Sequence, residues 1–118
     1  MWGTQNRTRN SYKREERTAI MIKVIVGYKV EPGENIAPIV LKLRTHAMTY
    51  NGFVSSEHLM NDDENSIIAI LETWNSIEEW REWEKSPIRQ ALLRDAQPLL
   101  AEEPRVTRYK IIPTVWNP

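Results

Sequence analysis

A chain of 118 residues is long enough for one domain with its own core and too short for two. Its 16 basic and 16 acidic residues cancel, which excludes a global field that would draw it to nucleic acid or to an anionic membrane. It has no cysteine, so disulfides, thiolate nucleophiles and cysteine metal sites are excluded, and no apolar run has the length of a membrane helix or a signal peptide. We therefore expect a cytoplasmic protein.

The N-terminal segment is polar and basic and has no apolar periodicity, so it is predicted to be a disordered tail. One hypothesis places it outside the natural protein, because the codons of Arg14, Glu15 and Glu16 can form a purine-rich ribosome-binding sequence and Met21 follows as a start. The alternative is a nucleic-acid-binding arm, although no second basic patch is present. The expected boundaries are 1–20 for the tail, 21–112 for the domain and 113–118 for an apolar C-terminal arm.

The first half of the domain combines a strand pattern and a helix pattern. Alternating apolar residues predict a half-buried strand over 22–30. After a Pro-Gly turn, apolar residues at helical spacing predict a helix that Asn35 caps and that ends near Met48 or Tyr50. An Asn-Gly pair then stops this helix, because both residues tolerate the left-handed conformation of a C-cap.

The second half begins with a hairpin of strands at 53–60 and 66–74, joined by a polar turn. Ser76 and Glu79 have the spacing of a capping box and predict a short helix, and Pro87 starts another one. Pro98 is expected to kink or fray the end of that last helix. Alternation predicts a fourth strand over 105–112.

This order, β-α-β-β-α-α-β, is typical of a ferredoxin-like α+β domain with a four-stranded antiparallel sheet. Right-handed crossovers place all the helices on one face and leave the other face bare. Ile25 points to that bare face, and the strand at 66–74 offers apolar residues to both sides. An uncovered and partly apolar face predicts a partner, and the simplest partner is a second copy packed sheet on sheet. We therefore expect a homodimer.

Several motifs resemble the antibiotic biosynthesis monooxygenase domain over nearly all of 21–112. They are Glu72-Thr73-Trp74-Asn75-Ser76-Ile77-Glu78-Glu79-Trp80 followed by Ser86-Pro87, with Pro32-Gly33, Asn51-Gly52-Phe53, Pro98-Leu99-Leu100 and Arg108-Tyr109. The resemblance implies a dimeric α+β barrel with a small apolar pocket between sheet and helices in each subunit. It also implies oxygenation of electron-rich aromatics, such as anthrones and quinols, by O₂ without a metal or flavin cofactor.

A related branch of that family binds and degrades haem with an asparagine in the first strand and a histidine in the last helix. Counting along this sequence places Val26 and Leu93 there, and neither side chain can bind iron. Haem degradation by that mechanism is therefore disfavoured, whereas loose haem binding stays open. Trp83 stands at a position that resembles the helix tryptophan of the same branch.

The two histidines are the natural candidates for a general base near neutral pH. His58 shares a strand face with apolar residues and could face the pocket or the dimer interface, whereas His46 near a helix end is typical of a solvated side chain. They are not predicted to form a metal site, because no third ligand accompanies them.

Aromatic and basic residues supply the other candidates. Trp80 and Trp83 lie three positions apart on one helix, and each could be core or a pocket wall that stacks on a planar substrate. Tyr28 and Tyr109 could bind a phenolic substrate through their hydroxyls, and Arg108 could stabilise an anion. The alternative for Arg108 is an exposed cross-strand ion pair with Glu57 or Glu72.

The leading hypothesis is a cofactor-independent monooxygenase acting on a small anthrone- or quinol-type aromatic, with His58 and Trp83 as catalytic residues. Trp80, Tyr28, Tyr109 and Arg108 are then the residues expected to bind the substrate. A second hypothesis is a non-catalytic dimeric module of the same fold that binds a small molecule or haem. A purely structural dimer is the third.

Overall fold

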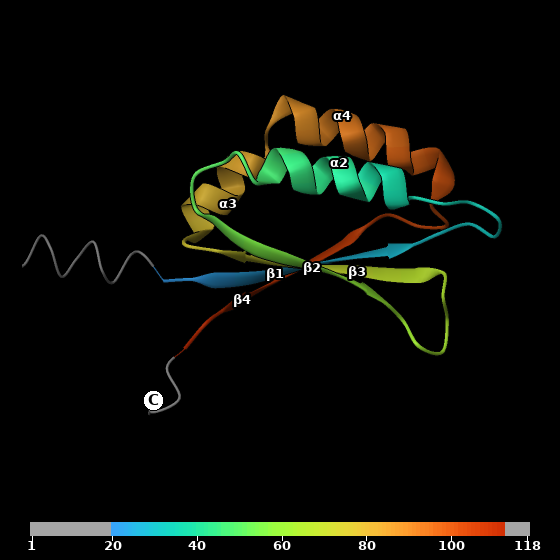
Figure 1. The fold of residues 1–118 in the computed structure, drawn as a ribbon, viewed down its shortest axis with the longest axis horizontal. Coiled ribbons are helices and arrows are strands. Elements are labelled where there is room, and N and C mark those ends of the chain that lie inside the picture. The colour runs from blue at the N-terminus through green and yellow to red at the C-terminus, as the bar shows by residue number, and fades with distance from the viewer. Residues whose placement is uncertain (1–19, 113–118) are drawn as a thin grey trace, which may run out of the picture.

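The computed structural model describes residues 20–112, so the predictions for the tail and the C-terminal arm concern segments outside the described range. Figure 1 shows four strands and three helices, with a short 3₁₀ turn, η1, after the last helix. In chain order they are β1 (Ile22–Lys29), α2 (Ala37–Ala47), β2 (Phe53–Met60), β3 (Ile67–Trp74), α3 (Ile77–Glu84), α4 (Pro87–Ala96), η1 (Gln97–Leu99) and β4 (Arg105–Lys110). None of the helices in this range is long and apolar enough to cross a membrane.

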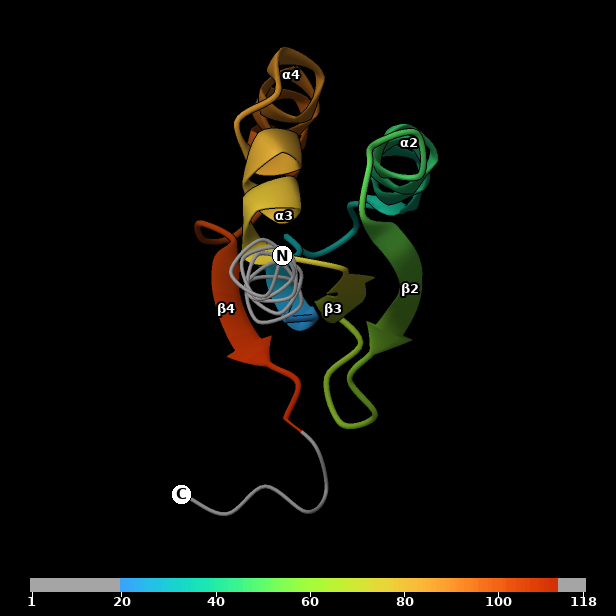
Figure 2. The same cartoon turned by 90° about the vertical axis from the view of Figure 1, so that its left-hand side faces the viewer.

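The strands form one antiparallel sheet in the order β2-β3-β1-β4. Helices α2, α3 and α4 all lie on the same face of this sheet, as Figure 2 shows. The predicted ferredoxin-like α+β fold is therefore confirmed, and its sheet is open. We call the side that carries the helices the covered face and the opposite side the open face.

Strand β1 alternates in burial along its whole length, as its sequence predicts. Ile22, Val24, Val26 and Tyr28 are buried on the covered face, whereas the residues between them are half-buried on the open face. Residues opposite one another on neighbouring strands share a face of the sheet. Glu72 on β3 and Arg108 on β4 are both paired with Val24, so all three lie on the covered face. Val30, predicted as the last strand residue, makes only an isolated bridge to Leu100.

Helix α2 differs from its prediction at its start. Ile36 occupies the N-cap position, and Asn35 acts one position earlier by accepting a hydrogen bond from the Ala37 amide at 3.0 Å. The helix ends at Ala47 with Met48 as its C-cap, which agrees with the first of the two predicted ends, and the chain then tightens into a turn. Gly52, with φ +89°, completes this turn, and a Cβ atom at that position would lie 2.5 Å from the Glu79 side chain.

The caps of the two short helices are as predicted. Ser76 Oγ accepts from the Glu79 amide at 3.2 Å, as in a capping box, and the Ser76 hydroxyl donates to the Glu79 carboxylate at 3.0 Å. Ser86 accepts from the Arg89 amide at 3.3 Å at the start of α4. Pro98 was expected to kink or fray the end of α4, and it lies in the 3₁₀ turn η1 that follows this helix.

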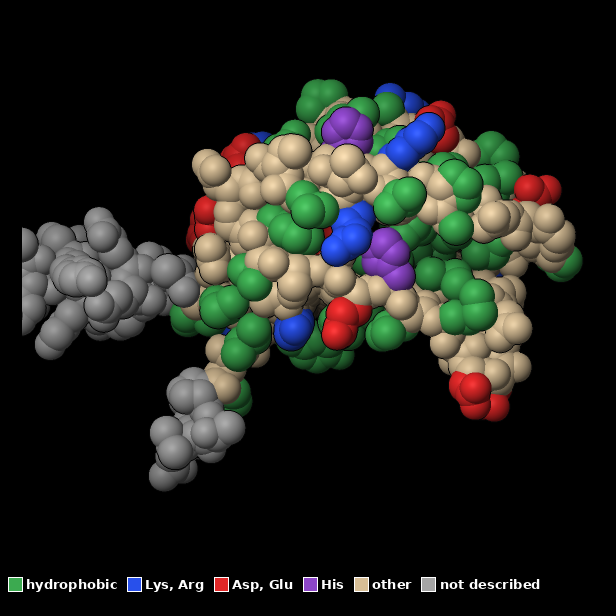
Figure 3. Space-filling model, viewed as in Figure 1, with side chains coloured by type: hydrophobic (Ala, Val, Ile, Leu, Met, Phe, Trp, Pro, Cys, Tyr) green, Lys and Arg blue, Asp and Glu red, His purple; other side chains and the backbone are tan. Residues whose placement is uncertain are grey.

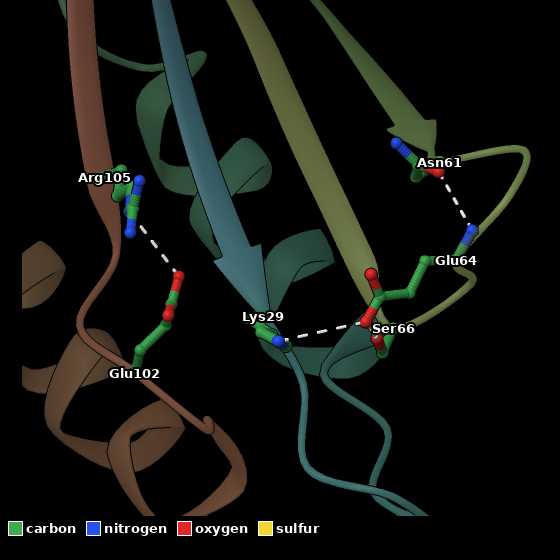
Figure 4. A network of polar contacts seen from close by, with 6 residues as sticks. All are labelled: Lys29, Asn61, Glu64, Ser66, Glu102 and Arg105. Carbon is green, nitrogen blue, oxygen red and sulfur yellow. Dashed lines mark hydrogen bonds and ion pairs between the residues drawn. The ribbon is translucent and has the colours of Figure 1, made fainter.

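The loop between β2 and β3 is the predicted solvated turn, and Figure 4 shows its polar contacts. Asn61 accepts from the amides of Asp63 and Glu64, both at 2.9 Å, and Lys29 lies 3.9 Å from the Glu64 carboxylate. A second exposed ion pair joins Arg105 to Glu102 at 3.5 Å. Exposed pairs of this kind contribute little stability, so the loop is held mainly by its Asn61 turn.

Candidate functional site

The covered face contains a small inner cavity between the sheet and the helices, with a volume of about 20 Å³. A space of this size holds about one water molecule. Its walls combine apolar and ionisable side chains from strands β1, β2 and β3 and helices α2, α3 and α4. The lining residues are Val26, Tyr28, Val40, Leu43, Arg44, His58, Ile70, Glu72, Trp83 and Arg89.

A larger outer groove of about 460 Å³ adjoins this cavity. It lies between the connection from β1 to α2 and the paired ends of β2 and β3, with walls that include Ile36, Met60 and Ile68. His58 and Val40 belong to both spaces. The groove has the size of a small-ligand site, and His58 stands where the two spaces meet.

Figure 3 shows both histidines of the chain, one high on the helical layer and the other lower, beside a basic side chain. His58 is on the covered face of β2, opposite Ile70, and much of its side chain is exposed at this edge of the sheet. Burial of the rest lowers its pKa below the ordinary value of 6.5, and the Arg44 guanidinium lowers it further. The imidazole is therefore neutral at pH 7 and able to accept a proton. His46 is exposed on α2 and lines neither space.

Burial favours the protonated form of two acidic groups in the cavity. Burial raises the pKa of the Tyr28 hydroxyl to about 12, with a smaller opposing effect from Arg89. The pKa of Glu72 is also raised, first by burial, whereas a hydrogen bond from Trp74 and the charge of Arg89 act in the opposite direction. Tyr28 is thus a hydrogen-bond donor at neutral pH, as a phenolic substrate would require.

Glu72 is the first site residue that the sequence interpretation missed. The expected exposed ion pair of Glu72 is wrong: the side chain is only 7% exposed on the covered face, and no ion pair within the described range includes it. Its Oε1 accepts a hydrogen bond from the Trp74 indole at 3.1 Å. Alternation from Ile70 and Trp74 could have placed Glu72 with them, but the continuous apolar run of β3 hides that period.

Arg89 is the second missed residue. It is only 6% exposed, although it is an arginine on the short helix α4, and its Nη1 donates to the Glu84 carbonyl at 3.4 Å. The available signal was its spacing, because Arg89 precedes the buried residues Leu92 and Ala96 by three and seven positions. Arginine is rarely buried, so its charge alone gave no reason to place it in the core.

Three of the six predicted site residues meet at the cavity: Tyr28, His58 and Trp83. Trp83 is 1% exposed, and the ring of Tyr50 meets it edge-on at 5.1 Å between centroids. The other three lie elsewhere: Trp80 is buried outside the cavity lining, Arg108 lies over the Trp80 ring at 5.4 Å, and Tyr109 is exposed on the open face beside Lys23.

Neither position of the haem-degrading pattern carries an iron ligand. Val26 is part of the cavity wall, whereas Leu93 lies on α4 outside both spaces described above. The residues present do not fit haem held in the manner of that branch. Within residues 20–112, no group of three or more His, Cys, Asp or Glu side chains is arranged to hold a metal ion.

No protein-family model and no curated protein matches the sequence. Solved structures do match. A candidate antibiotic biosynthesis monooxygenase from Caulobacter crescentus has a TM-score of 0.74 at 17% identity, covering 85% of this chain and 99% of that one. SnoaB, a cofactor-independent oxygenase from Streptomyces nogalater, has a TM-score of 0.69 at 13% identity, covering 82% and 98%.

A conserved protein from Methanosarcina mazei also matches, with a TM-score of 0.72 at 14% identity over 80% of this chain and 96% of that chain. At identities this low, the structural similarity is evidence for the fold alone, and the activity has to be inferred from the site. The chain therefore has the fold of the antibiotic biosynthesis monooxygenases, as the motifs in its sequence predict.

Proposed function

We propose that this protein is a cofactor-independent monooxygenase that oxygenates a small aromatic compound of the anthrone or quinol type. The observation that carries the proposal is that the neutral His58 lies where a mainly apolar groove meets a small polar cavity. The likeness in fold to SnoaB, a cofactor-independent oxygenase, supports the reaction class.

The chemistry asks three things of the protein: to bind an aromatic, to remove a proton from it and to keep bulk water away from the anion. The outer groove offers apolar walls for the ring, and His58 accepts the proton. The resulting carbanion or phenolate is electron-rich enough to reduce O₂ directly. For an anthrone, the ring CH₂ then becomes C=O, and the second oxygen atom leaves as water with the two hydrogens.

Tyr28 and Trp83 have supporting roles in this proposal. The Tyr28 hydroxyl keeps its proton at neutral pH and can donate a hydrogen bond to the substrate oxygen. Trp83 forms a wall of the cavity behind His58, where it excludes water. The residues placed elsewhere, Trp80, Arg108 and Tyr109, have no direct contact with substrate in this arrangement.

Oxygen uptake with a panel of anthrones and hydroquinones tests the proposal. A consumed substrate should lose most of its turnover in His58→Gln and in Trp83→Phe, because the base and the water-excluding wall contribute to the reaction. His46→Gln is the matched control, since His46 is exposed away from the site and should leave turnover unchanged. Saturable binding of these compounds without oxygen uptake would favour the alternative, a non-catalytic binding module.

We also propose that two copies associate through the open face. Its centre carries half-buried apolar side chains, Ile25, Ala69 and Leu71, and its rim carries both Lys23 and Glu57. A face with an apolar centre and charges of both signs at its edge is complementary to itself. The sequence gives no sign of an oxidising compartment, and we propose the cytoplasm for the assembled protein.

A further inference from the structure

Arg89 presents a buried positive charge to the inner cavity. The guanidinium comes from the first turn of α4, where Ser86 caps the helix, and it lines the cavity with Tyr28 and Glu72. A buried cation normally has an anionic partner, because its desolvation is costly. No carboxylate within the described residues lies within ion-pair distance of Arg89, and its guanidinium makes one long hydrogen bond, from Nη1 to the Glu84 carbonyl at 3.4 Å.

The charges around the cavity leave an excess of positive charge. Arg44 and Arg89 both line it, whereas Glu72 is its only lining carboxylate. Arg44 is partly engaged, since its Nε donates to Ser56 Oγ at 3.0 Å. His58 and Tyr28 are the other titratable groups of the wall, and both are uncharged near neutral pH. An anion placed in the cavity would therefore find Arg89 available.

The size of the cavity decides which part of a ligand can enter. A volume of about 20 Å³ accommodates one oxygen atom or one water molecule but no ring. The ring would have to stay in the outer groove, which is more than large enough for it. His58 borders both spaces, so it stands beside the bond between a ring in the groove and an oxygen in the cavity.

We propose that Arg89 holds the ionised oxygen of the substrate in the inner cavity, which makes the site selective for aromatics that carry a phenol or enol hydroxyl. This inference rests on the proposed function for the aromatic class. In the step that Arg89 supports, the O–H bond of the substrate breaks, its proton forms an N–H bond on His58, and the electron pair stays on the oxygen. The guanidinium then stabilises that oxyanion in a site from which water is excluded.

The test uses 4-nitrophenol, whose phenolate absorbs visible light, bound to the full chain without any turnover. We expect the pKa of the bound phenol to lie about one to three below that of the free compound, because a buried cation stabilises the anion. Arg89→Met should abolish this change and weaken nitrophenolate binding roughly ten- to a hundredfold. Arg89→Lys, which keeps the charge, should retain part of it.

Two controls separate the charge from general effects on the pocket. Arg94→Met removes an exposed arginine from the same helix, outside both spaces, and should leave the titration unchanged. 4-Nitroanisole has the same ring and no ionisable hydroxyl, so its binding should be insensitive to Arg89→Met. Loss of its binding in Arg89→Met would indicate a collapsed pocket, and the wild-type titration and Arg89→Lys then decide the proposal.

An unshifted or raised pKa in the wild-type complex, the same lowered pKa in Arg89→Met, or no saturable nitrophenolate binding would each overturn the proposal. The result is independent of oxygen uptake. A chain that binds nitrophenolate through Arg89 and consumes no O₂ refutes the proposed oxygenase but not this anion site. A chain that oxygenates quinols with Arg89→Met as active as wild type refutes the anion site alone.

Discussion

The two faces of the sheet reverse the usual distribution of side chains. The covered face, which is screened from water, contains ionisable groups such as Tyr28 and Glu72. The open face, which no described residue covers, carries apolar side chains at its centre, among them Ile25 and Leu71. Burying polar groups and exposing apolar ones both cost free energy, so each face indicates a binding partner. We propose a ligand for the covered face and a second copy of the chain for the open face.

The largest expected effect is on the open face. Ile25→Lys would bury an unpaired charge at the proposed interface, because its cross-strand neighbours Leu71 and Thr107 are uncharged. The cost of about 3–5 kcal/mol raises the dimer dissociation constant about a hundredfold or more, which sedimentation at micromolar concentration measures. Leu41→Lys, a matched change from an aliphatic residue to lysine at a position of α2 that is 58% exposed, is the control and should leave assembly unaltered. A wild-type chain that sediments as a 13.9 kDa species would contradict the dimer.

The next effect compares two tryptophans of the covered face, both fully buried. The Trp74 indole donates to Glu72, whereas the Trp80 Nε1 has no partner among the described residues. Trp74→Phe therefore leaves a buried carboxylate without its donor, whereas Trp80→Phe removes an unsatisfied donor. We expect Trp74→Phe to lower the free energy of unfolding by about 1–3 kcal/mol more than Trp80→Phe, as measured by urea denaturation. Equal losses would show that packing alone governs both sites.

A smaller effect concerns the pH dependence of stability. Burial raises the pKa of Glu72 in the folded state, so the native chain binds this proton more tightly than the unfolded chain. The resulting stability is present below the unfolded pKa and is lost as the pH rises through the folded pKa. Glu72→Gln should therefore gain stability relative to wild type as the pH rises above the ordinary glutamate pKa of 4.5.

The Gln side chain can still accept from the Trp74 indole, so the comparison isolates the charge. Glu57→Gln, an exposed carboxamide substitution on the open face opposite Leu71, controls for the general loss of one acidic group. Parallel pH profiles for the two variants would show that Glu72 is ionised in the fold at no cost.

The smallest effect is the titration of His58. Burial, followed by the charge of Arg44, lowers its pKa, so the neutral form is favoured in the fold. Its contribution to stability is present above the unfolded pKa and is lost as the pH falls through the folded pKa. NMR of the chain with His46→Gln leaves a single imidazole to follow. Adding Arg44→Gln should raise the His58 pKa while it stays below its ordinary value, because burial remains.

If His58 is the base, the acid limb of the oxygenation rate should follow the same titration and move with Arg44→Gln. A His58 pKa at or above 6.5 in the folded chain would contradict the assigned environment. A rate profile that does not follow the His58 titration would show that His58 is not the catalytic base.

Much of the fold could be predicted because its signals are local. The alternation of Ile22, Val24 and Val26 and the spacing of Ser76 and Glu79 each act within a few residues, and the structure contains both features where they were expected. Helix ends were less predictable. The turn after α2 places Gly52 close to the Glu79 side chain, which lies 27 positions later in the sequence and is therefore not a local signal.

The candidate site was predictable only in part, for the same reason. Tyr28 and His58 could be chosen because their strands alternate clearly, which indicates the face to which each side chain points. Glu72 lies in a continuous apolar run that hides its face, and Arg89 is a charged residue on a short helix, a type that is rarely buried. Their burial follows from tertiary packing that brings residues of β1, β2, β3 and the three helices to one cavity.

The sequence by itself determined the order of strands and helices, the two faces of β1 and the caps of α3 and α4, because hydrophobic periodicity and capping operate between near neighbours. The tertiary structure alone decided that Glu72, Arg89 and His58 share a space the size of one water molecule beside a groove large enough for a ring. Convergence of this kind depends on crossover connections and helix packing, whose partners are distant in the chain and leave no periodic trace in it.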